Sequence, residues 1–573
     1  MRKSVVASLL VLGLAAAGAG MAEQAAVSGE HGMVVSVQYL ASQVGADVLK
    51  KGGNAVDAAI AVGYALAVVH PAAGNVGGGG FMTIRFADGR TKFLDFRERA
   101  PQLATPTLFQ DKDGNVIPGL SEVGYLAAGI PGTVAGFELA REKYGTFPRA
   151  ALVNPAIELA EKGFPLKEGG DLDFIKEVLK DLAKDPEAAR IFLTDGKNVP
   201  KAGTIIKQPD LAKTLKIIAA QGNEGFYKGP IADAIVAASD AHHGILKKAD
   251  FERYVPHERE PVTCTYRGYT VVTAAPPSSG GTTICELLNI VEGYDLGKLG
   301  FHTAASIHVL AEAMRHAFYD RNSSMGDPDF VQNPIAHMTD KTYAKEIRAG
   351  IAEDKATPSA SLGSVAGAAR EGQHTTDYVV VDKDGTAVSV VYTLNDWFGS
   401  KVVATGTGIV LNNEMDDFSA KPGVPDAVGL VTGENNQILP NKAPLSSMSP
   451  TILVRPDGKT AVVVGSFGSG TIITSVAQVL INLVDYHMGV QEAVDQPRIH
   501  QQWLPDVIAY DKGAFSEQVA RQLEAMGYKL SEGTIAGASE TIVVGGDKVS
   551  AKSDGKIYGA NDRRSPVGAA VGW

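Results

Sequence analysis

A pair of threonines in the middle of the chain, Thr375 and Thr376, lies where a loop-like segment meets a strand-like run. The segment before them, roughly residues 352–373, is rich in Ala, Ser and Gly, and Tyr378-Val-Val-Val follows. A hydroxyl at such a junction can attack the peptide bond before it. If the bond between His374 and Thr375 breaks, Thr375 becomes an N-terminus that carries both a nucleophile and an α-amine. The pKa of such an amine, about 7.7–8, suits a general base near neutral pH.

Other polar motifs follow Thr375, each beside an expected strand. They are Thr393-Leu-Asn395, Asn412-Asn-Glu414-Met-Asp416-Asp417, Ser446-Ser447 and Gly465-Ser-Phe-Gly468-Ser469-Gly470. Each has an ordinary explanation, because β-branched pairs fit strands, acidic clusters cap helices, and serine pairs and glycine loops form turns. Each motif alone is weak. Their occurrence together, in this order, favours an active site.

The surrounding pattern predicts the elements that must position these residues. Turns of the Asp-Gly or Gly-Gly-Asp type predict four β-hairpins, which pair 81–85 with 91–97, 378–381 with 387–393, 451–455 with 461–465, and 541–544 with 549–552. Apolar periodicity predicts helices over 37–51, 54–69, 133–143, 152–162, 211–221, 231–242, 283–293, 304–320, 471–485 and 516–526. Helices that alternate with antiparallel hairpins indicate a layered α+β fold. The second hairpin brings Thr393 and Asn395 back toward Thr375.

A glycine-rich segment, residues 74–80, precedes the first of these hairpins. Four consecutive glycines can suggest phosphate binding, but no Gly-Lys-Ser/Thr follows, and a strand follows where a phosphate loop needs a helix. We therefore expect a tight turn that allows close approach of neighbouring backbones.

The N-terminus has the three parts of a secretory signal peptide. Met1-Arg-Lys is basic, residues 4–19 carry no charge, and Gly20-Met-Ala22 ends in a small residue. The apolar run is short for a membrane span. We expect cleavage after Ala22, export to the periplasm or the medium, and no membrane span in the mature chain.

The composition limits which classes of partner this chain can bind. A hydrophobic content of 45% and a charged content of 20% are typical of a globular protein. The net charge of −11 and the absence of a Lys/Arg run argue against nucleic acid as a partner. The two cysteines, Cys264 and Cys285, match no metal-binding spacing, and they could form one disulfide or stay as two thiols.

Taken together, these motifs resemble those of the gamma-glutamyltransferase family, also called glutathione hydrolases. The matching segments include Lys50-Lys-Gly-Gly-Asn-Ala-Val-Asp-Ala-Ala59, Asp95-Phe-Arg-Glu98, Pro276-Pro-Ser-Ser-Gly-Gly281, Met415-Asp-Asp-Phe-Ser419, Pro444-Leu-Ser-Ser-Met-Ser-Pro450 and Gln496-Pro-Arg498. The resemblance implies an N-terminal-nucleophile hydrolase fold of class α+β, a four-layer αββα sandwich with two stacked, mostly antiparallel sheets. It implies self-cleavage into a large subunit, residues 23–374, and a small subunit, residues 375–573, which remain together as a heterodimer.

The resemblance also implies a role for each candidate residue. Thr375 would be the nucleophile, Thr393 would hydrogen-bond its hydroxyl, and the backbone N–H groups of Gly468 and Ser469 would bind the oxyanion. The other candidates would hold the γ-glutamyl group, its carboxylate by Arg97, Ser446 and Ser447, and its ammonium by Asn395, Glu414 and Asp417. Glutathione and related γ-glutamyl compounds would be substrates, amino acids or peptides would be acceptors, and neither a metal nor a cofactor would be needed.

Three positions depart from the family pattern. Relatives often have Gly-Ser-Pro-Gly-Gly at the oxyanion turn, where this chain has Phe467 and Ser469. On a Gly/Pro/Asn-rich loop, residues 422–441, which we expect to be a lid, Val428 replaces a tyrosine. The residue before the nucleophile is His374, which could influence cleavage or be a passive linker.

Two alternatives remain at this point. A glutaryl-type cephalosporin acylase would share the fold, but a substrate without an ammonium would not need the carboxylate of Asp417. An inactive exported binding protein would need neither the hydroxyls of Thr375 and Thr393 nor the polar groups of Asn395 and Arg97.

Overall fold

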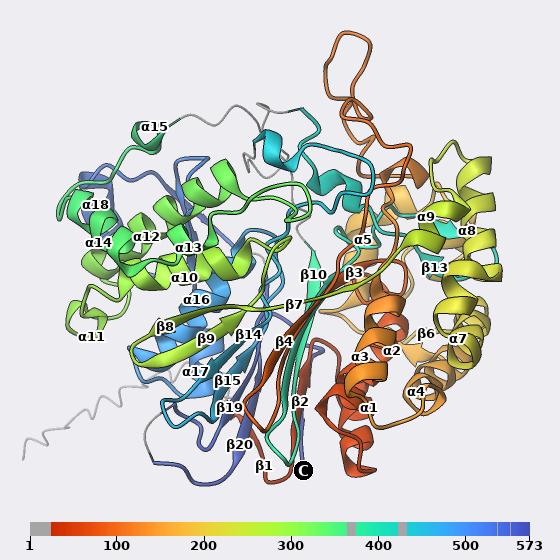
Figure 1. Cartoon of the computed structure of the whole chain (residues 1–573), viewed down its shortest axis with the longest axis horizontal. Coiled ribbons are helices and arrows are strands. Elements are labelled where there is room, and N and C mark those ends of the chain that lie inside the picture. Colours follow the sequence, from red (N-terminus) through yellow and green to blue (C-terminus); the bar gives the residue numbers. More distant parts are fainter. Residues whose placement is uncertain (1–24, 364–373, 422–432, 536, 550–551) are drawn as a thin grey trace, which may run out of the picture.

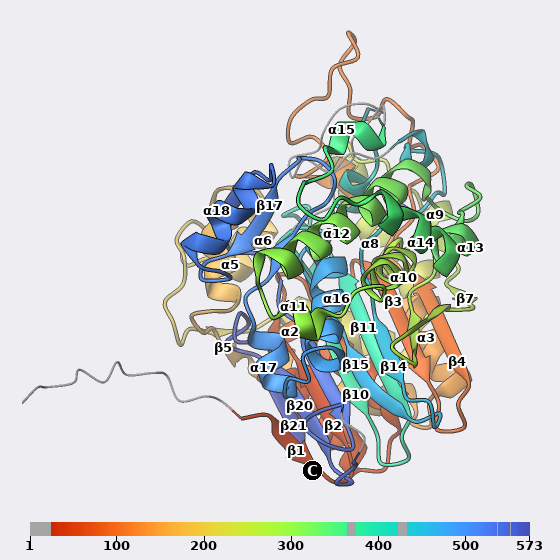
Figure 2. The same cartoon turned by 90° about the vertical axis from the view of Figure 1, so that its left-hand side faces the viewer.

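Two stacked β-sheets form the centre of the molecule, and helices cover the outer face of each (Figures 1 and 2). This computed structural model describes residues 25–363, 374–421, 433–535, 537–549 and 552–573. The expected signal peptide, Val428 and most of the expected lid lie outside the described residues. The arrangement is a four-layer αββα sandwich, as the resemblance implied.

The sheet that carries Thr375, here the β10 sheet, has seven strands with antiparallel pairing. In spatial order they are β21 (Ala569–Gly572), β2 (Met33–Ser36), β10 (Thr375–Val381), β11 (Ala387–Thr393), β3 (Gly79–Arg85), β4 (Thr91–Phe96) and β7 (His257–Arg259).

The second sheet, here the β14 sheet, also has seven antiparallel strands. In spatial order they are β1 (Val27–Gly29), β20 (Ile557–Asn561), β19 (Glu540–Val544), β15 (Thr460–Val464), β14 (Thr451–Val454), β9 (Tyr269–Thr273) and β8 (Val262–Tyr266). Both sheets thus mix strands from before and after Thr375.

The alternation of side chains along β10 directs the nucleophile into the space between the sheets. Val379 and Val381 belong to the inter-sheet core, whereas Tyr378 and Val380 pack against the helices over the β10 sheet. Because successive side chains in a strand point to opposite faces, Thr375 shares the inward face with Val379 and Val381. It lies at the open end of the sandwich, where β10 begins.

The helices over the β10 sheet come from the first half of the chain, and α2 packs directly on β10 and β11. The helices of that half are α1 (Tyr39–Lys50), α2 (Ala55–Val69), α3 (Thr133–Tyr144), α4 (Arg149–Lys162), α5 (Asp171–Leu182), α6 (Pro186–Phe192), α7 (Pro209–Gln221), α8 (Pro230–Ala241) and α9 (Lys248–Arg253). A capping box between Asn54 and Asp57 begins α2, whose residues are all buried.

The helices over the β14 sheet centre on α10, which contacts α12, α16, β8 and β9. The remaining helices are α10 (Gly280–Val291), α11 (Leu296–Leu299), α12 (Ala304–Ser324), α13 (Ile335–Met338), α14 (Lys341–Gly350), α15 (Ser359–Leu362), α16 (Thr471–Val484), α17 (Val490–Asp495) and α18 (Glu517–Ala525). Smaller sheets pair β5 (Phe164–Pro165) with β6 (Ile205–Ile206), β12 (Val403–Ala404) with β13 (Ile409–Val410), and β17 (Ile508–Asp511) with both β16 (Ile499–His500) and β18 (Leu530–Gly533).

The ten predicted helices and three of the four predicted hairpins are present, with ends shifted by a few residues. The fourth hairpin is wrong. β19 pairs with β20, at Ile557–Asn561, and not with residues 549–552. The turn signal at Gly545-Gly-Asp marks the end of β19 at Val544, but the next strand of the sheet begins only at Ile557.

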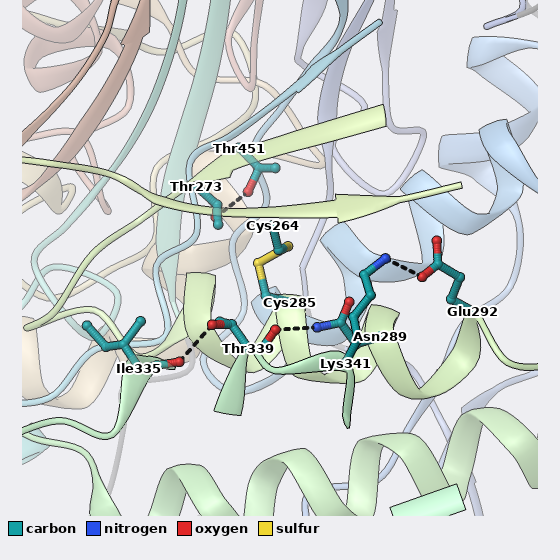
Figure 3. The surroundings of a disulfide bond; sticks show 9 residues. All are labelled: Cys264, Thr273, Cys285, Asn289, Glu292, Ile335, Thr339, Lys341 and Thr451. Atoms are coloured by element: carbon teal, nitrogen blue, oxygen red, sulfur yellow. Dashed lines mark hydrogen bonds and ion pairs between the residues drawn. A yellow bond between two sulfur atoms is a disulfide. The ribbon is translucent and has the colours of Figure 1, made fainter. Parts of the chain in front are cut away.

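The two cysteines form a disulfide that joins β8 to α10 (Figure 3). Cys285 is fully buried and Cys264 is half-buried. Near the bond, Asn289 of α10 donates to the carbonyl oxygen of Thr339 at 2.9 Å, which ties α10 to the loop before α14. The disulfide therefore fixes an outer helix to an edge strand. Within the described residues, no helix combines the length and apolar character needed to cross a membrane.

Candidate active site

Thr375 and Thr393 face each other at the open ends of β10 and β11. They are Cα partners in the antiparallel ladder, and both side chains are almost fully buried. The Thr393 hydroxyl donates to the carbonyl oxygen of His374 at 3.0 Å and accepts from the backbone N–H of Asn395 at 2.8 Å. The family resemblance implies that Thr393 hydrogen-bonds the Thr375 hydroxyl. In the uncut chain it instead contacts the carbonyl of the bond that would break.

The glycine-rich segment before β3 brings this pair into place. Asn75 donates to the carbonyl oxygen of Thr393 at 2.8 Å and accepts from the N–H of Gly78 at 3.0 Å. A Cβ at Gly78 would lie 2.0 Å from the Thr393 oxygen, and one at Gly80 would lie 2.5 Å from Tyr392. The prediction of a turn that permits close backbone approach is therefore confirmed.

Arg97 lies at the end of β4 among three acidic side chains. Its guanidinium donates to Glu414 and Asp417, and Glu98 lies 3.5 Å from it. Glu414 and Asp417 come from one 3₁₀ turn, residues 414–417. The resemblance assigned Arg97 to a carboxylate and the two acids to an ammonium. In the structure Arg97 instead pairs with these two acids, because charges this deeply buried need partners.

Burial controls protonation in this cluster. It raises the pKa of Glu414 to about 8 and that of Glu98 to about 7, although the charge of Arg97 opposes both shifts. It also raises the pKa of Asp417, and the neighbouring Glu414 raises it further. Burial disfavours the charge of Arg97, but the carboxylates outweigh that effect and raise its pKa. Three carboxyl groups thus surround one guanidinium, and burial favours protonation of the acids in excess of that single positive charge.

Ser446 and Ser447 complete the same pocket. Ser446 lies beside Ser278 in a parallel bridge, and its carbonyl oxygen accepts from both the N–H and the hydroxyl of Ser279 at 2.7 Å. The hydroxyl of Ser447 accepts from Arg321, a fully buried residue of α12, at 3.0 Å. The Pro276–Gly281 motif, known from the sequence only as a family match, thus supports the serine pair.

The turn before α16 places its backbone in conformations that favour glycine. Gly468 has φ 123° and Ser469 has φ 62°. Serine adopts the left-handed conformation here at a cost, at a position where the family pattern has glycine. The turn precedes the N-terminus of a 14-residue helix, whose dipole favours negative charge. The backbone N–H groups of Gly468 and Ser469 in this turn therefore suit the binding of an oxyanion.

Nearly all the candidate residues line one pocket. It is lined by Arg97, Thr375, Thr393, Asn395, Glu414, Asp417, Ser446, Ser447, Met448, Ser469 and Ile472. Two candidates do not line it: Gly468, which lies next to Ser469 in the oxyanion turn, and His374, whose carbonyl is bound to Thr393.

Sequence reasoning missed several supporting residues: Asn75, Glu98, Ser279, Arg321 and Trp397. Arg321 lies in α12, a helix that is buried over most of its length, and a buried guanidinium requires polar partners. Trp397, on which the ring of His374 stacks, is placed there by tertiary packing and had no local signal.

The whole chain is similar to several known proteins. A family model described as Gamma-glutamyltranspeptidase matches residues 41–572. The chain is 54% identical to a glutathione hydrolase proenzyme of Pseudomonas sp. (strain A14), over 96% of each chain. It is 48% identical to a glutathione hydrolase proenzyme of Escherichia coli (strain K12), over 96% of this chain and 93% of that one. Among solved structures, a cephalosporin acylase from Bacillus halodurans has a TM-score of 0.83 and 27% identity, covering 98% of this chain and 99% of the other.

Proposed function

The chain belongs to the gamma-glutamyltranspeptidase family, and from this premise we propose which of its residues carry out the activity of a self-processing γ-glutamyl hydrolase and transferase. The protein is an enzyme of the N-terminal-nucleophile fold that acts on glutathione and related γ-glutamyl compounds. The observation that carries the assignment is the Thr375–Thr393 pair, with the Thr393 hydroxyl on the carbonyl before Thr375 and the Arg97 cluster in the same pocket.

Self-cleavage is proposed between His374 and Thr375. The Thr375 hydroxyl attacks the His374 carbonyl carbon, and the hydroxyl from Thr393 stabilises the oxygen as it becomes negative. The C–N bond breaks, and the proton of the attacking hydroxyl ends on the released amine. Water then hydrolyses the ester, leaving a carboxylate on His374 and a free α-amine on Thr375.

This cut would divide the mature chain into residues 23–374 and 375–573. Because both sheets contain strands from each part, the two products would stay together without a covalent link between them. The signal peptide, residues 1–22, and export to the periplasm or the medium are further parts of the proposal. The disulfide supports them, since such bonds persist in oxidising compartments.

Turnover of a γ-glutamyl amide uses the same hydroxyl. The α-amine of Thr375 accepts the hydroxyl proton while the oxygen attacks the γ-carbonyl, and the N–H groups of Gly468 and Ser469 bind the oxyanion. The leaving amine takes the proton and departs, so that a γ-glutamyl ester remains on Thr375. Water or the amine of an amino acid or peptide then cleaves that ester, which gives hydrolysis or transfer.

Substrate binding requires the buried charges to exchange partners. The substrate carboxylate would bind Arg97, Ser446 and Ser447, and its ammonium would bind Glu414, Asp417 and the side-chain oxygen of Asn395. Each buried charge keeps an opposite charge beside it, so binding does not leave one unpaired. Glutathione as donor and amino acids or peptides as acceptors fit this scheme.

Paired substrates test the specificity. The mature protein should release aniline dye from a γ-glutamyl anilide, and a denaturing quench should trap the γ-glutamyl group on Thr375. The glutaryl counterpart, which lacks the ammonium, should react at least 100-fold more slowly, because buried acids lose their partner. Equal rates would favour the acylase activity instead. Rejection of both substrates by a fully cleaved protein would overturn the proposal.

A further inference from the structure

The side chain of His374 occupies an aromatic and acidic setting outside the catalytic pocket. Its ring stacks on Trp397 with a centroid distance of 4.2 Å and an interplanar angle of 9°. Its Nε2 lies 3.6 Å from a carboxylate oxygen of Glu177. Phe174 stacks on Trp397 at 3.7 Å and 21°. We call Trp397, Phe174 and Glu177 the Trp397 box.

The box is built from two anchored segments. Phe174 and Glu177 are three residues apart on α5, so both side chains lie on one face of the helix. The carboxylate of Asp171, at the start of α5, lies 3.0 Å from Nδ1 of His70 and accepts a hydrogen bond from the N–H of Ala72 at 2.9 Å. The N–H after Trp397, that of Phe398, donates to Ala72 at 2.7 Å. The loop at 70–72 thus ties α5 to Trp397.

Core packing explains only part of this arrangement, because Trp397 and Phe174 belong to the apolar core over the β10 sheet but the Glu177 carboxylate does not. Trp397 is buried, but Phe174 is only partly buried and the Glu177 carboxylate is mostly exposed. A tryptophan face with a carboxylate beside it, here Trp397 with Glu177, is a typical binding site for an imidazole or a cation. Trp397 does not line the catalytic pocket.

His374 is held at two points in the uncut chain. Its carbonyl oxygen accepts from Thr393, and its ring is stacked on Trp397. These two contacts lie on either side of the His374 Cα, so together they limit rotation about the bonds that orient the carbonyl. Without the ring contact, the carbonyl would sample orientations that the Thr375 hydroxyl cannot attack.

We propose that the Trp397 box is a binding site for the side chain of the residue before the cleaved bond, and that Trp397, Phe174 and Glu177 are positioning residues for self-cleavage. This proposal rests on the proposed cut between His374 and Thr375. The site takes an aromatic or cationic side chain, with histidine satisfying both the stacking surface and the carboxylate.

The test follows the rate of self-cleavage in newly made precursor. The full chain is synthesised in a cell-free system under oxidising conditions, synthesis is stopped, and the intact mass is followed with time. Trp397→Leu, which keeps an apolar side chain, should slow cleavage about 10- to 100-fold, because small misplacements of reacting groups cost this much. Trp397→Phe should recover most of the rate. Glu177→Gln should slow it only about two- to fivefold, since its pair with His374 is largely exposed.

Substitutions at His374 separate stacking from charge. His374→Phe keeps the stack and should cleave close to the Glu177→Gln rate, whereas His374→Ala should match Trp397→Leu. The double variant His374→Ala/Trp397→Leu should be no slower than either single variant, because both changes remove the same contact. Phe301→Ala, which removes another ring stacked on a histidine at 3.9 Å, and Glu158→Gln, from an exposed ion pair, are matched controls and should leave the rate unchanged.

The proposal would be overturned if Trp397→Leu cleaved within twofold of the unaltered chain, or if the double variant multiplied the two single effects. A folding defect is separable, because thermal unfolding of each variant in the uncleavable Thr375→Ala chain reports stability without cleavage. Failure of the cut site itself is also separable, because sequencing of the new N-terminus would then give a residue other than Thr375 in every variant.

Discussion

The hydroxyl of Thr393 lies 3.0 Å from the carbonyl oxygen of His374 and donates a hydrogen bond to it. This contact places a donor on the oxygen that becomes negative when Thr375 attacks. After the proposed cleavage releases His374, this hydroxyl would lose that acceptor and be able to donate to Thr375, its partner across the ladder. We therefore expect Thr393 to act in both self-cleavage and turnover.

Removal of this donor should slow self-cleavage. Thr393→Ala should lower the rate about 100-fold, which is typical for loss of one donor to an oxyanion. Thr393→Ser keeps the hydroxyl and should cleave within a few-fold of the unaltered chain. The measurement is the fraction of cleaved chain against time. Fast cleavage of Thr393→Ala would show that the contact has no role in the reaction.

The buried acids beside Arg97 should make stability depend on pH. The folded chain holds the proton of Glu414 up to about pH 8, whereas an unfolded glutamate loses it near its ordinary pKa of about 4.3. Between these values the unfolded state binds fewer protons than the folded state, so stability falls as pH rises. Glu414→Gln should remove this part of the loss.

The comparison uses the uncleavable Thr375→Ala chain with and without Glu414→Gln. Thermal unfolding midpoints should diverge in favour of the glutamine variant as pH increases from about 5 to 8. Parallel curves across this range would contradict a raised pKa at Glu414.

The oxyanion turn predicts opposite effects for two neighbouring substitutions. Ser469→Gly relieves the left-handed conformation and should change the unfolding free energy by no more than about 1 kcal/mol, in the stabilising direction, with activity retained because the N–H remains. Gly468→Ala places a side chain at φ 123° and should destabilise by about 1–3 kcal/mol. Displacement of its N–H should also lower kcat. Chemical unfolding and steady-state kinetics measure both, and a stabilising Gly468→Ala would contradict the geometry of this turn.

The disulfide should stabilise the protein without taking part in catalysis. Cys264→Ser/Cys285→Ser should lower the unfolding free energy by about 2–4 kcal/mol, because the bond restricts the unfolded chain. Activity well below the unfolding temperature should be unchanged, since neither cysteine lines the catalytic pocket. Equal stability of the reduced and oxidised protein would mean that the bond adds nothing to the fold.

Local signals predicted the longer helices and the strands of three hairpins, but not the short helices or strands such as β2, β8 and β20. The capping residue Asn54, the Asp-Gly turns and the apolar faces of the helices act over a few residues, and the structure follows them. The failed hairpin after β19 shows the limit, because a turn ends a strand without determining which strand pairs next. The pairing of β14 with β9, more than 170 residues earlier in the chain, likewise has no local signal.

The candidate site was predictable in its members but not in its contacts. Motif resemblance led to the residues that line the pocket, and their roles in the reaction stay predictions. The pairing of Arg97 with Glu414 and Asp417 arises because charges buried together must balance one another, and Arg97 is far from both acids in the sequence. The stack of His374 on Trp397 arises from long-range packing of α5 against the loop after β11.

The central claim is that the chain cuts itself before Thr375 to make its own nucleophile. The most direct measurement is the intact mass, under denaturing conditions, of the purified protein and of Thr375→Ala. We predict two fragments for the former, the smaller running from Thr375 to Trp573, and one uncut chain for Thr375→Ala. An uncut but active protein, a cut at another bond, or equal cleavage of Thr375→Ala would contradict the account.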